Sequence, residues 1–524
     1  MASVLQKGGS AAPAPAAPRG AASAVKLGVF TLAMMNVAAV VSLRGIPAEA
    51  EYGLSSIFYY LFAAVFFLIP VSLVAAELAT GWPQNGGVFR WVGEAFGPRW
   101  GFLAIWLQWL ESTIWYPTVL TFAAVALAFL GPDQTWDQAL AANKWYTLVI
   151  VLLVYWGATF INFRGVGFMG AVSKWGSLVG TIIPATLLIV LGFVYFGQVM
   201  SGTPDVAGMP GTGLQIKLGW DQVIPDFTNF NNIVLAASIF LFYAGMEMSA
   251  VHVKDLDNPA RNYPLAILVA SILTVAIFVL GTLAVGFVVP NQDINLVQTL
   301  LVFFDDTLDA YHVGFLKYVM ALCLAFGVLG GVVTWVGGPS KGLLAVGRAG
   351  YLPPFLQQTN ANGIQVHILL VQALIVTFLS VLFVVLPSVQ TAYQILSQLT
   401  IILYLIMYLL MFGAAIHLRY SEPNTYRAYK VPGGEVGMWI IGGAGLVGSL
   451  IAFLLSFVPP SQIPTGGPAT YVGFLIAGTV VCVAIPFLIY ASRKPHWRTP
   501  EGAADFEPFN WEREGRHPGQ QSTR

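Results

Sequence analysis

The sequence contains few charged residues. Asp, Glu, Lys and Arg together make up only 9% of its 524 residues, whereas soluble domains contain about 25%. Hydrophobic residues account for 57% of the chain, and the mean hydropathy is +0.74. This composition excludes an ordinary soluble protein and predicts a chain that crosses a lipid bilayer many times. Because 24 basic residues balance 24 acidic ones, the charge gives no indication of a nucleic-acid partner.

Cysteine and the motifs of common catalytic sites are also scarce. The only two cysteines, Cys323 and Cys482, lie in apolar runs, where a thiol behaves as a small hydrophobic group. They provide neither a disulfide framework nor a zinc site, and the sequence has no His-Glu-x-x-His metal motif. A nucleotide-binding Gly-x-x-x-x-Gly-Lys-[Ser/Thr] loop is absent as well. We therefore expect no metal, no cofactor and no enzymatic activity, and no use of ATP.

Long apolar windows fill the rest of the chain. Residues 1–24 are rich in Ala, Pro, Gly and Ser and lack the apolar core of a signal peptide, so they are predicted to form a disordered cytoplasmic tail. We expect one transporter domain over 25–491 and a second cytoplasmic tail over 492–524. Twelve windows are long enough to cross about 30 Å of hydrocarbon. They lie near 27–50, 54–79, 101–131, 145–163, 175–200, 230–252, 264–289, 313–346, 366–386, 392–418, 436–458 and 470–491.

The basic residues indicate the orientation of these spans. An even number of spans places both termini on the same side of the membrane. With both termini inside, only four of the 24 Lys and Arg residues fall in the outer half: Arg44, Lys144, Lys217 and Lys317. Basic residues concentrate on the cytoplasmic side of membrane proteins, so both termini are predicted to be cytoplasmic.

Two of the spans carry residues that interrupt a helix. The first span has Gly45 and Pro47 beyond a stretch of small and polar residues, and the sixth has Ala244 and Gly245 in the middle of its apolar run. The spacing of these breaks fits transporters built from two inverted five-helix repeats whose first helices are interrupted at the substrate site. We predict an all-α membrane protein with twelve transmembrane helices, of which helices 1 and 6 are broken. The repeats are expected over about 25–200 and 230–419, with two extra helices over 436–491.

A broken helix offers binding groups for an amino acid. The amides at the N-terminus of the second half-helix can bind an α-carboxylate. The carbonyls that end the first half can accept hydrogen bonds from an α-ammonium. Irregular backbone at this depth is tolerated where it lines a cavity. A zwitterion can therefore bind at the breaks without a full charge on the protein.

Short motifs occur in a characteristic order through the apolar region. They are Pro83-Gln-Asn-Gly-Gly-Val-Phe-Arg-Trp-Val92, Phe96-Gly-Pro-Arg-Trp-Gly-Phe102, Tyr243-Ala-Gly-Met-Glu247, Ala250-Val-His-Val253, Asn258-Pro-Ala-Arg-Asn-Tyr-Pro-Leu-Ala266, Trp335-Val-Gly-Gly-Pro-Ser-Lys-Gly342, Val431-Pro-Gly-Gly434 and Ser456-Phe-Val-Pro-Pro460. The first two resemble the loop and third-helix start of the amino acid, polyamine and organocation (APC) superfamily of permeases. Together the motifs resemble most closely the bacterial glutamate/γ-aminobutyrate antiporter family.

This resemblance implies a broken-helix carrier of amino acids in the bacterial cytoplasmic (inner) membrane. The Gly-x-Gly that is common at the first break of the superfamily is missing, and Val40-Val41-Ser42 stands in its place. The antiporter family also has a cytoplasmic C-terminal segment that closes the pore at neutral pH. The C-terminal tail of this sequence is short. One interpretation of this tail is that it plugs the pore in the same way. The substrate contacts that the breaks and the resemblance indicate are Val40, Val41, Ser42, Tyr243, Ala244, Gly245 and Trp335.

A carboxylate follows the second break. Glu247 matches the sixth-helix carboxylate of the family. An ionisable group inside a spanning helix costs a few kcal/mol or more and by default faces the bundle interior or an aqueous cavity. We therefore predict that Glu247 couples transport to protons or gates the substrate. The alternative is a buried neutral acid that is held by hydrogen bonds.

Arg44 lies just beyond the first break. An intramembrane arginine usually has a partner, and pairing with Glu111 or Glu49 is the interpretation that the sequence favours. Contact with an acidic substrate comes second, and snorkelling to the outer interface third. If Arg44 contacts the substrate, acidic amino acids are favoured. We keep Arg44 and Glu111 among the candidate substrate-binding residues.

Two polar stripes lie on otherwise apolar spans. In the third span, Gln108, Glu111, Ser112 and Trp115 fall on one helical face, which predicts that this face points into the bundle. It serves either to line a cavity or to form hydrogen bonds between helices. In the tenth span, ordinary helix packing is slightly favoured over a hydrated pathway. That second stripe consists of Tyr393, Ser397, Thr400, Tyr404 and Tyr408.

The function that these observations favour is secondary active transport. A channel requires rings of polar residues along its pore, and no such repeat is visible in the sequence. We expect alternating access with exchange of glutamate for γ-aminobutyrate; the alternative is a broader amino acid:proton symporter. The expected partners are an amino acid substrate, the lipid bilayer and, through Glu247, protons.

Overall fold

The computed structural model describes residues 28–202, 213–225, 238–248, 257–459 and 467–521. Over these ranges the chain is helical, apart from turns and one isolated bridge between Thr359 and Gln365. Ten helices in these ranges are long and apolar enough to cross a membrane. The prediction of an all-α membrane protein is therefore confirmed. The N-terminal tail, 1–24, lies outside the described residues.

The ten long helices correspond to the predicted second to fifth and seventh to twelfth spans. Three of them are built from two labelled segments each, because a π-helical turn or a short kink interrupts the regular hydrogen bonding. Their bounds are α3 (Ser55–Ala63) with α4 (Ile69–Gly81), α6 (Pro98–Ala128), α8 (Lys144–Phe163), α9 (Val166–Ser177) with α10 (Ile183–Met200), α12 (Pro259–Val288), α14 (Leu316–Arg348), α15 (Val366–Ser380) with α16 (Leu382–Val385), α17 (Val389–Ser421), α18 (Gly434–Leu455) and α19 (Pro468–Ala491).

The predicted first and sixth spans are represented by shorter helices. The first consists of α1 (Val29–Val40) and α2 (Ile46–Ala50). The sixth is described only as α11 (Ser238–Tyr243) and the residues up to 248, because 226–237 and 249–256 lie outside the described residues. The total of twelve spans and the inverted repeat stay predictions.

Both predicted interruptions are present. Helix α1 ends at Val40, and Val41 and Ser42 are extended, with φ/ψ of −73°/115° and −130°/121°, before a short 3-10 turn leads into α2. Helix α11 ends at Tyr243, and Gly245 follows with a φ of +113°. Backbone with this positive φ favours glycine, because a Cβ atom would clash with the neighbouring peptide.

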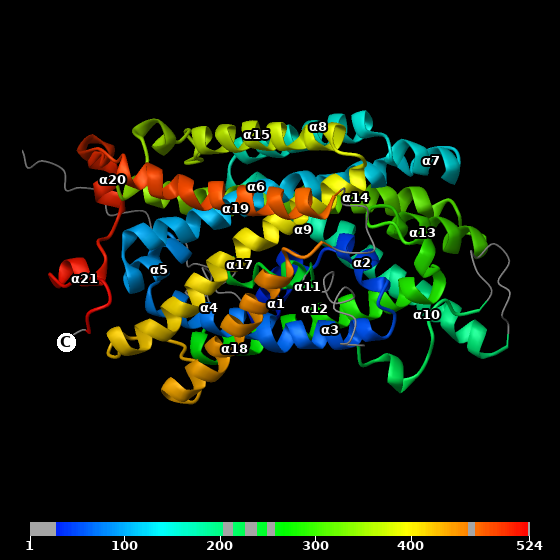
Figure 1. Cartoon of the computed structure of the whole chain (residues 1–524), viewed down its shortest axis with the longest axis horizontal. Helices are drawn as coiled ribbons and strands as arrows, with labels where there is room; N and C mark the ends of the chain where they lie inside the picture. The colour runs from blue at the N-terminus through cyan, green and yellow to red at the C-terminus, as the bar shows by residue number, and fades with distance from the viewer. Residues whose placement is uncertain (1–27, 203–212, 226–237, 249–256, 460–466, 522–524) are drawn as a thin grey trace, which may run out of the picture.

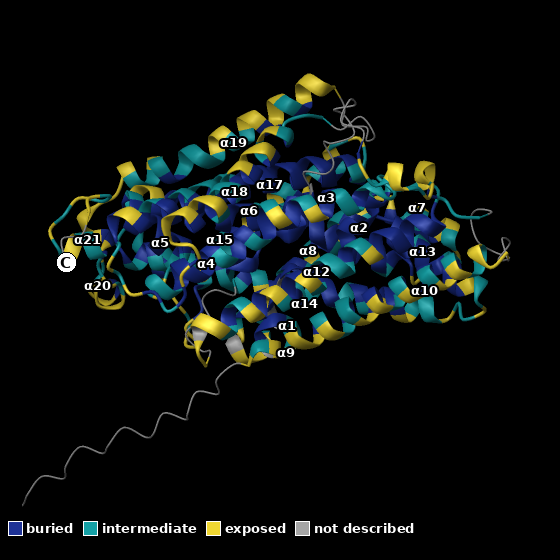
Figure 2. Ribbon diagram, turned by 90° about the horizontal axis from the view of Figure 1, so that it is seen from below, coloured by how far each residue is buried: buried dark blue, intermediate teal, exposed yellow. Residues whose placement is uncertain are grey.

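The molecule is elongated, and its two ends are built from different short helices (Figures 1 and 2). Helices α7 (Gln134–Ala141) and α13 (Thr299–Ala310) lie at one end. The opposite end carries α5 (Val88–Phe96) and the C-terminal helices α20 (Pro500–Asp505) and α21 (Asn510–Arg513). The long helices run between these ends.

Helix α6 is the central element of the bundle. Nearly all of its residues are buried, because it packs against α17, α14, α5 and α8. Helix α19, by contrast, exposes apolar side chains such as Val480 and Leu488 on the outside of the bundle (Figure 2). Such an apolar surface is what a spanning helix presents to lipid. Helices α6 and α17 therefore form the interior of the bundle, whereas α1 and α2 pack mainly against α12, and α11 packs against α17 and α3.

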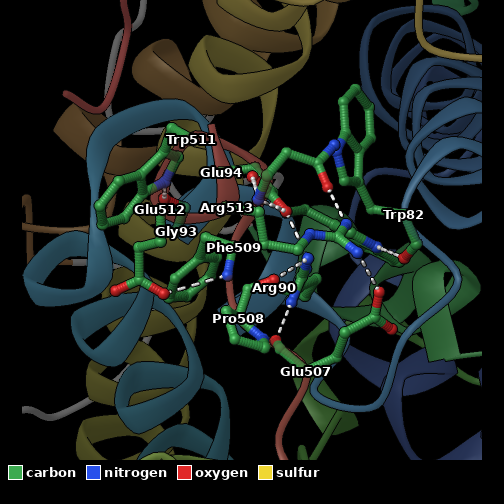
Figure 3. Close-up of polar contacts among 12 residues, drawn as sticks. Trp82, Arg90, Gly93, Glu94, Glu507, Pro508, Phe509, Trp511, Glu512 and Arg513 are labelled. Carbon is green, nitrogen blue, oxygen red and sulfur yellow. Dashed lines mark hydrogen bonds and ion pairs between the residues drawn. The ribbon is translucent and has the colours of Figure 1, made fainter. Parts of the chain in front are cut away.

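The C-terminal tail docks on α5 (Figure 3). The guanidinium of Arg90 donates hydrogen bonds to the backbone carbonyls of Glu507 and Pro508, at 2.5 and 3.0 Å. Arg90 also forms a fully buried ion pair with Glu94, at 2.6 Å. The carboxylate of Glu94 accepts a hydrogen bond from the backbone amide of Asn510, at 3.0 Å. Burial raises the pKa of Glu94 to about 7 despite the neighbouring Arg90.

Candidate functional site

A central cavity lies at the two helix breaks. It has a volume of about 80 Å³ available to the centres of water molecules. Its walls come from the two breaks and from one face each of α6, α9–α10, α14 and α17. The lining residues that the argument uses are Val40, Val41, Ser42, Arg44, Glu111, Trp115, Phe242, Ala244, Trp335 and Tyr404.

Arg44 is the cationic side chain of this cavity. It is only 3% exposed, and its Nη1 donates a hydrogen bond to the hydroxyl of Tyr393, at 2.9 Å. The centre of the guanidinium lies 5.6–5.8 Å from the rings of Trp115, Phe242 and Tyr393. The Nε atom is buried without a hydrogen-bond partner in the described part of the chain. Three aromatic rings therefore surround the charge, and two of them, Trp115 and Phe242, also line the cavity.

The ion pair that the sequence favours for Arg44 is not formed. Among the described residues, neither Glu111 nor Glu49 lies within ion-pair distance of its guanidinium. Glu111 instead accepts a hydrogen bond from the hydroxyl of Ser112, at 2.7 Å, in the next position of α6. The reason is geometric: Arg44 is held among aromatic rings, whereas the carboxylate of Glu111 is bonded within its own helix. The burial of Arg44 also excludes snorkelling to the membrane interface.

Glu247 lies at the centre of a buried hydrogen-bond network. Its Oε1 accepts hydrogen bonds from Gln108 Nε2, at 3.0 Å, and from the hydroxyl of Tyr404, at 2.5 Å. Its Oε2 accepts one from the hydroxyl of Tyr408, at 2.6 Å. That same hydroxyl accepts a hydrogen bond from the amide of Gly245, at 3.0 Å. The carboxylate is thus connected directly to the backbone of the second break.

A second cavity lies on the other side of this network. This vestibule has a volume of about 300 Å³ by the same measure and is lined by the segment between α4 and α5, by α6, by α14 and by Glu247. Much of the motif at 83–92 forms its wall. Tyr404 lines the central cavity and donates to Glu247, which lines the vestibule. The pair of Tyr404 and Glu247 therefore separates the two cavities.

The other predicted contacts differ in their positions. Ala244 and Trp335 line the central cavity, and the ring of Trp335 lies 5.8 Å from that of Trp115. Gly245 lies behind this wall, where a Cβ atom would come within 2.8 Å of Trp335. Tyr243 is not among the residues that line the cavity, and its ring packs against those of Tyr60 and Phe278. The structure thus brings seven of the predicted contacts to one cavity, the seven being Val40, Val41, Ser42, Arg44, Glu111, Ala244 and Trp335.

Three tyrosines of α17 have a larger part in the site than the sequence indicated. Tyr393 contacts Arg44, and Tyr404 and Tyr408 hold Glu247. Their helical spacing was visible in the sequence, but it favoured ordinary packing slightly. The spacing shows that the hydroxyls share a face, and only the tertiary structure shows that two intramembrane charged groups lie opposite that face.

Comparison with known proteins agrees with this geometry. A family model described as amino acid permease matches residues 27–482. The chain belongs to the amino acid permease family, within the APC superfamily. An uncharacterized transporter of Legionella pneumophila is 41% identical over 462 residues, which cover 88% of this chain and 96% of the relative. The glutamate/γ-aminobutyrate antiporter of Lactococcus lactis is 34% identical over 475 residues, which cover 89% and 90% of the two chains. The resemblance predicted from the motifs is confirmed.

Family membership makes the protein a multi-pass amino acid transporter. One pentapeptide of the permease, 338–342, fits the Gly-x-Ser-x-Gly pattern of serine hydrolases. Its Ser340 lies inside α14 and is fully buried. The hydroxyl donates to the carbonyl of Val336 and accepts a hydrogen bond from Gln365. Ser340 is therefore bonded as a packing residue of a helix and lacks the exposed turn that a hydrolase nucleophile needs.

The C-terminal tail of the permease lies beside the pathway. None of the described tail residues, 492–521, lines the central cavity or the vestibule. The tail instead contacts the outer side of α5 and the ends of α14 and α17, where Arg348 pairs with Asp505 and Glu422 with Arg516. In this conformation the described part of the tail does not plug the pathway.

Glu77 orders the same end of the molecule. Its carboxylate forms two hydrogen bonds with Arg419, at 2.6 and 2.5 Å, and lies 3.4 Å from Arg427. It also accepts a hydrogen bond from the backbone amide of Val431, at 2.7 Å. This buried cluster ties α4 to the connection between α17 and α18 and has no contact with the central cavity.

Proposed function

We propose that this permease is a secondary active transporter of the bacterial cytoplasmic membrane that exchanges glutamate for γ-aminobutyrate by alternating access. The observation that carries the proposal is the position of the central cavity at both helix breaks. Exposed backbone amides and carbonyls at such breaks suit the α-carboxylate and α-ammonium of an amino acid. The antiporter of Lactococcus lactis, with which the chain aligns over most of its length, gives the substrate pair.

The arrangement of the two cavities supports alternating access. A carrier needs a barrier on each side of its substrate that opens only in turn, and the contact between Tyr404 and Glu247 is suited to form one of them. Glu247 also reaches the second break through Tyr408 and the amide of Gly245. Protonation of Glu247 would remove an acceptor from these hydroxyls and so loosen the barrier and the break together. We therefore assign Glu247 the coupling role.

The membrane arrangement follows from the same proposal. Ten helices in a five-plus-five inverted repeat and two extra helices make twelve spans, and this even number places both termini on one side. The excess of basic residues assigns this side to the cytoplasm. The vestibule and the docked tail then face the cytoplasm, because both lie at the end of the molecule that carries α5 (Figure 1).

The test is uptake of labelled amino acids into proteoliposomes that contain the purified permease. Vesicles are either empty or preloaded with glutamate or γ-aminobutyrate, with and without an inward proton gradient. Exchange predicts that labelled glutamate enters only vesicles preloaded with γ-aminobutyrate or glutamate. Uptake into empty vesicles that follows the proton gradient would instead establish a symporter. Absence of glutamate and γ-aminobutyrate uptake under all conditions would refute the proposed substrates.

A further inference from the structure

Arg44 differs from the other well-buried arginines of the described chain. Arg90 pairs with Glu94, and Arg419 pairs with Glu77, so each of these charges is neutralised by a carboxylate. Arg44 is equally buried, yet its described contacts are one tyrosine hydroxyl and three aromatic rings. A buried charge without a counter-ion is strongly unfavourable. Cation–π contacts offset only part of that cost.

The open side of Arg44 faces the central cavity. Arg44 is one of the lining residues, and its Nε is a buried donor that lacks an acceptor in the described ranges. A guanidinium presents its donors in a planar fork that matches the two oxygens of a carboxylate. The aromatic rings of Trp115, Phe242 and Tyr393 hold the fork in place. The cavity therefore contains a preformed anion-binding group.

We propose that Arg44 binds the side-chain carboxylate of an acidic amino acid substrate. This inference rests on the proposed function and names the residue that selects the substrate class. The bound carboxylate supplies the counter-ion that Arg44 lacks among the described residues. Glutamine, in which a carboxamide replaces that carboxylate, leaves the charge of Arg44 unneutralised and is bound more weakly.

The chemistry of the two exchanged molecules gives this contact a second role. γ-Aminobutyrate is glutamate without the α-carboxylate, so the two molecules share the ammonium group and the distal carboxylate three carbons away. A site that recognises both must rely on these shared groups. Arg44 binds the shared carboxylate, whereas the backbone amides of the helix break bind the α-carboxylate, which only glutamate has. Loss of Arg44 should therefore weaken the binding of both exchange partners.

Ligand binding to the purified permease tests this assignment. Dissociation constants for glutamate, γ-aminobutyrate and glutamine are obtained from ligand-dependent melting temperatures of the wild type, Arg44→Gln and Arg44→Lys. A charge-assisted pair in a buried site corresponds to a factor of at least about ten in affinity. We expect Arg44→Gln to weaken the binding of glutamate and γ-aminobutyrate by at least this factor and to change the affinity for glutamine by less than about threefold. Arg44→Lys keeps the charge but not the planar fork of donors. Its preference for glutamate over glutamine should therefore lie between that of the wild type and that of Arg44→Gln.

The possible results separate the two proposals. An equal loss of affinity for glutamate and glutamine in Arg44→Gln would overturn the assignment, because it would place Arg44 at the α-carboxylate or in a purely structural role. Unchanged glutamate binding in Arg44→Gln would overturn it as well. If Arg44→Gln does not fold, an unchanged glutamate preference in Arg44→Lys has the same consequence. If the wild type binds neither glutamate nor γ-aminobutyrate, the proposed function fails. The assignment of Arg44 is then tested with aspartate and asparagine as ligands. It fails as well if the affinities for these two ligands do not differ between the wild type and the variants.

Discussion

Replacement of Glu247 by glutamine removes the titratable group of the network while nearly preserving its shape. The carboxylate accepts three hydrogen bonds, from Gln108, Tyr404 and Tyr408. A glutamine that keeps its oxygen at the Oε1 position can still accept from Gln108 and Tyr404. Its amide nitrogen then replaces Oε2 and faces the hydroxyl of Tyr408, which previously donated to that position.

The expected cost follows from the position of Tyr408. Its hydroxyl accepts hydrogen bonds from the Gly245 amide and, in the variant, from the new amide group, so its own hydrogen loses the acceptor it had. A buried hydroxyl that loses its partner costs about 1–3 kcal/mol. This energy corresponds to a change of roughly 5- to 150-fold in the equilibrium between carrier conformations. The variant should therefore transport more slowly, and its rate should no longer follow the protonation of residue 247.

The assay measures initial exchange rates in proteoliposomes between pH 5 and pH 8. The wild-type rate is expected to depend on pH, and Glu247→Gln is expected to show a lower and nearly flat profile. Glu435→Gln, an exposed change in the first turn of α18, is the matched control and should keep the wild-type profile. A Glu247→Gln variant with the wild-type pH profile, or a wild type without any pH dependence, would refute the coupling role.

Three further predictions concern stability and the docked tail. Glu77→Ala leaves Arg419 buried without its carboxylate and should destabilise the permease by about 3–5 kcal/mol; an unchanged melting temperature would contradict this. Gly245→Ala places a side chain at a φ of +113° and should lower the melting temperature and the transport rate. Gly473→Ala, whose Cβ meets no atom within 4 Å, should change neither quantity. Burial raises the pKa of Glu94 to about 7 in the folded permease, against an ordinary value of 4.5, so folding binds a proton between these values. The contribution of this group to stability is therefore fully present below about pH 4.5 and is lost as the pH rises through 7. The melting temperature of the wild type should show this pH trend relative to Glu94→Gln, in which residue 94 does not titrate.

The sequence predicted the architecture well where the physical constraint is local. A bilayer requires about 20 apolar residues per spanning helix, so the long helices could be located from composition alone. The interruptions at Val41–Ser42 and at Gly245 were also predictable, because glycine, proline and polar residues disfavour a continuous helix in that environment. The intramembrane position of Glu247 indicated a functional group for the same reason.

The partners of the charged residues could not be predicted in this way. Arg44 was assigned to a carboxylate because the sequence shows that a buried arginine needs compensation, but it does not show which groups approach it. The aromatic rings come from three separate helices, and one of them lies about 350 positions along the chain from Arg44. The same applies to Tyr408, whose link to Gly245 depends on how α17 packs against the second break.

The sequence by itself determined that this protein is a multi-pass helical carrier with two interrupted helices, because hydrocarbon allows few solutions for a polypeptide backbone. The tertiary structure decided that the interruptions meet in one cavity, that Glu247 separates this cavity from a vestibule, and that Arg44 faces the cavity without a carboxylate of the described chain. These features depend on the close packing of helices that are distant in sequence. Each such contact depends on distances of a few ångströms, which the periodicity of a single helix does not encode.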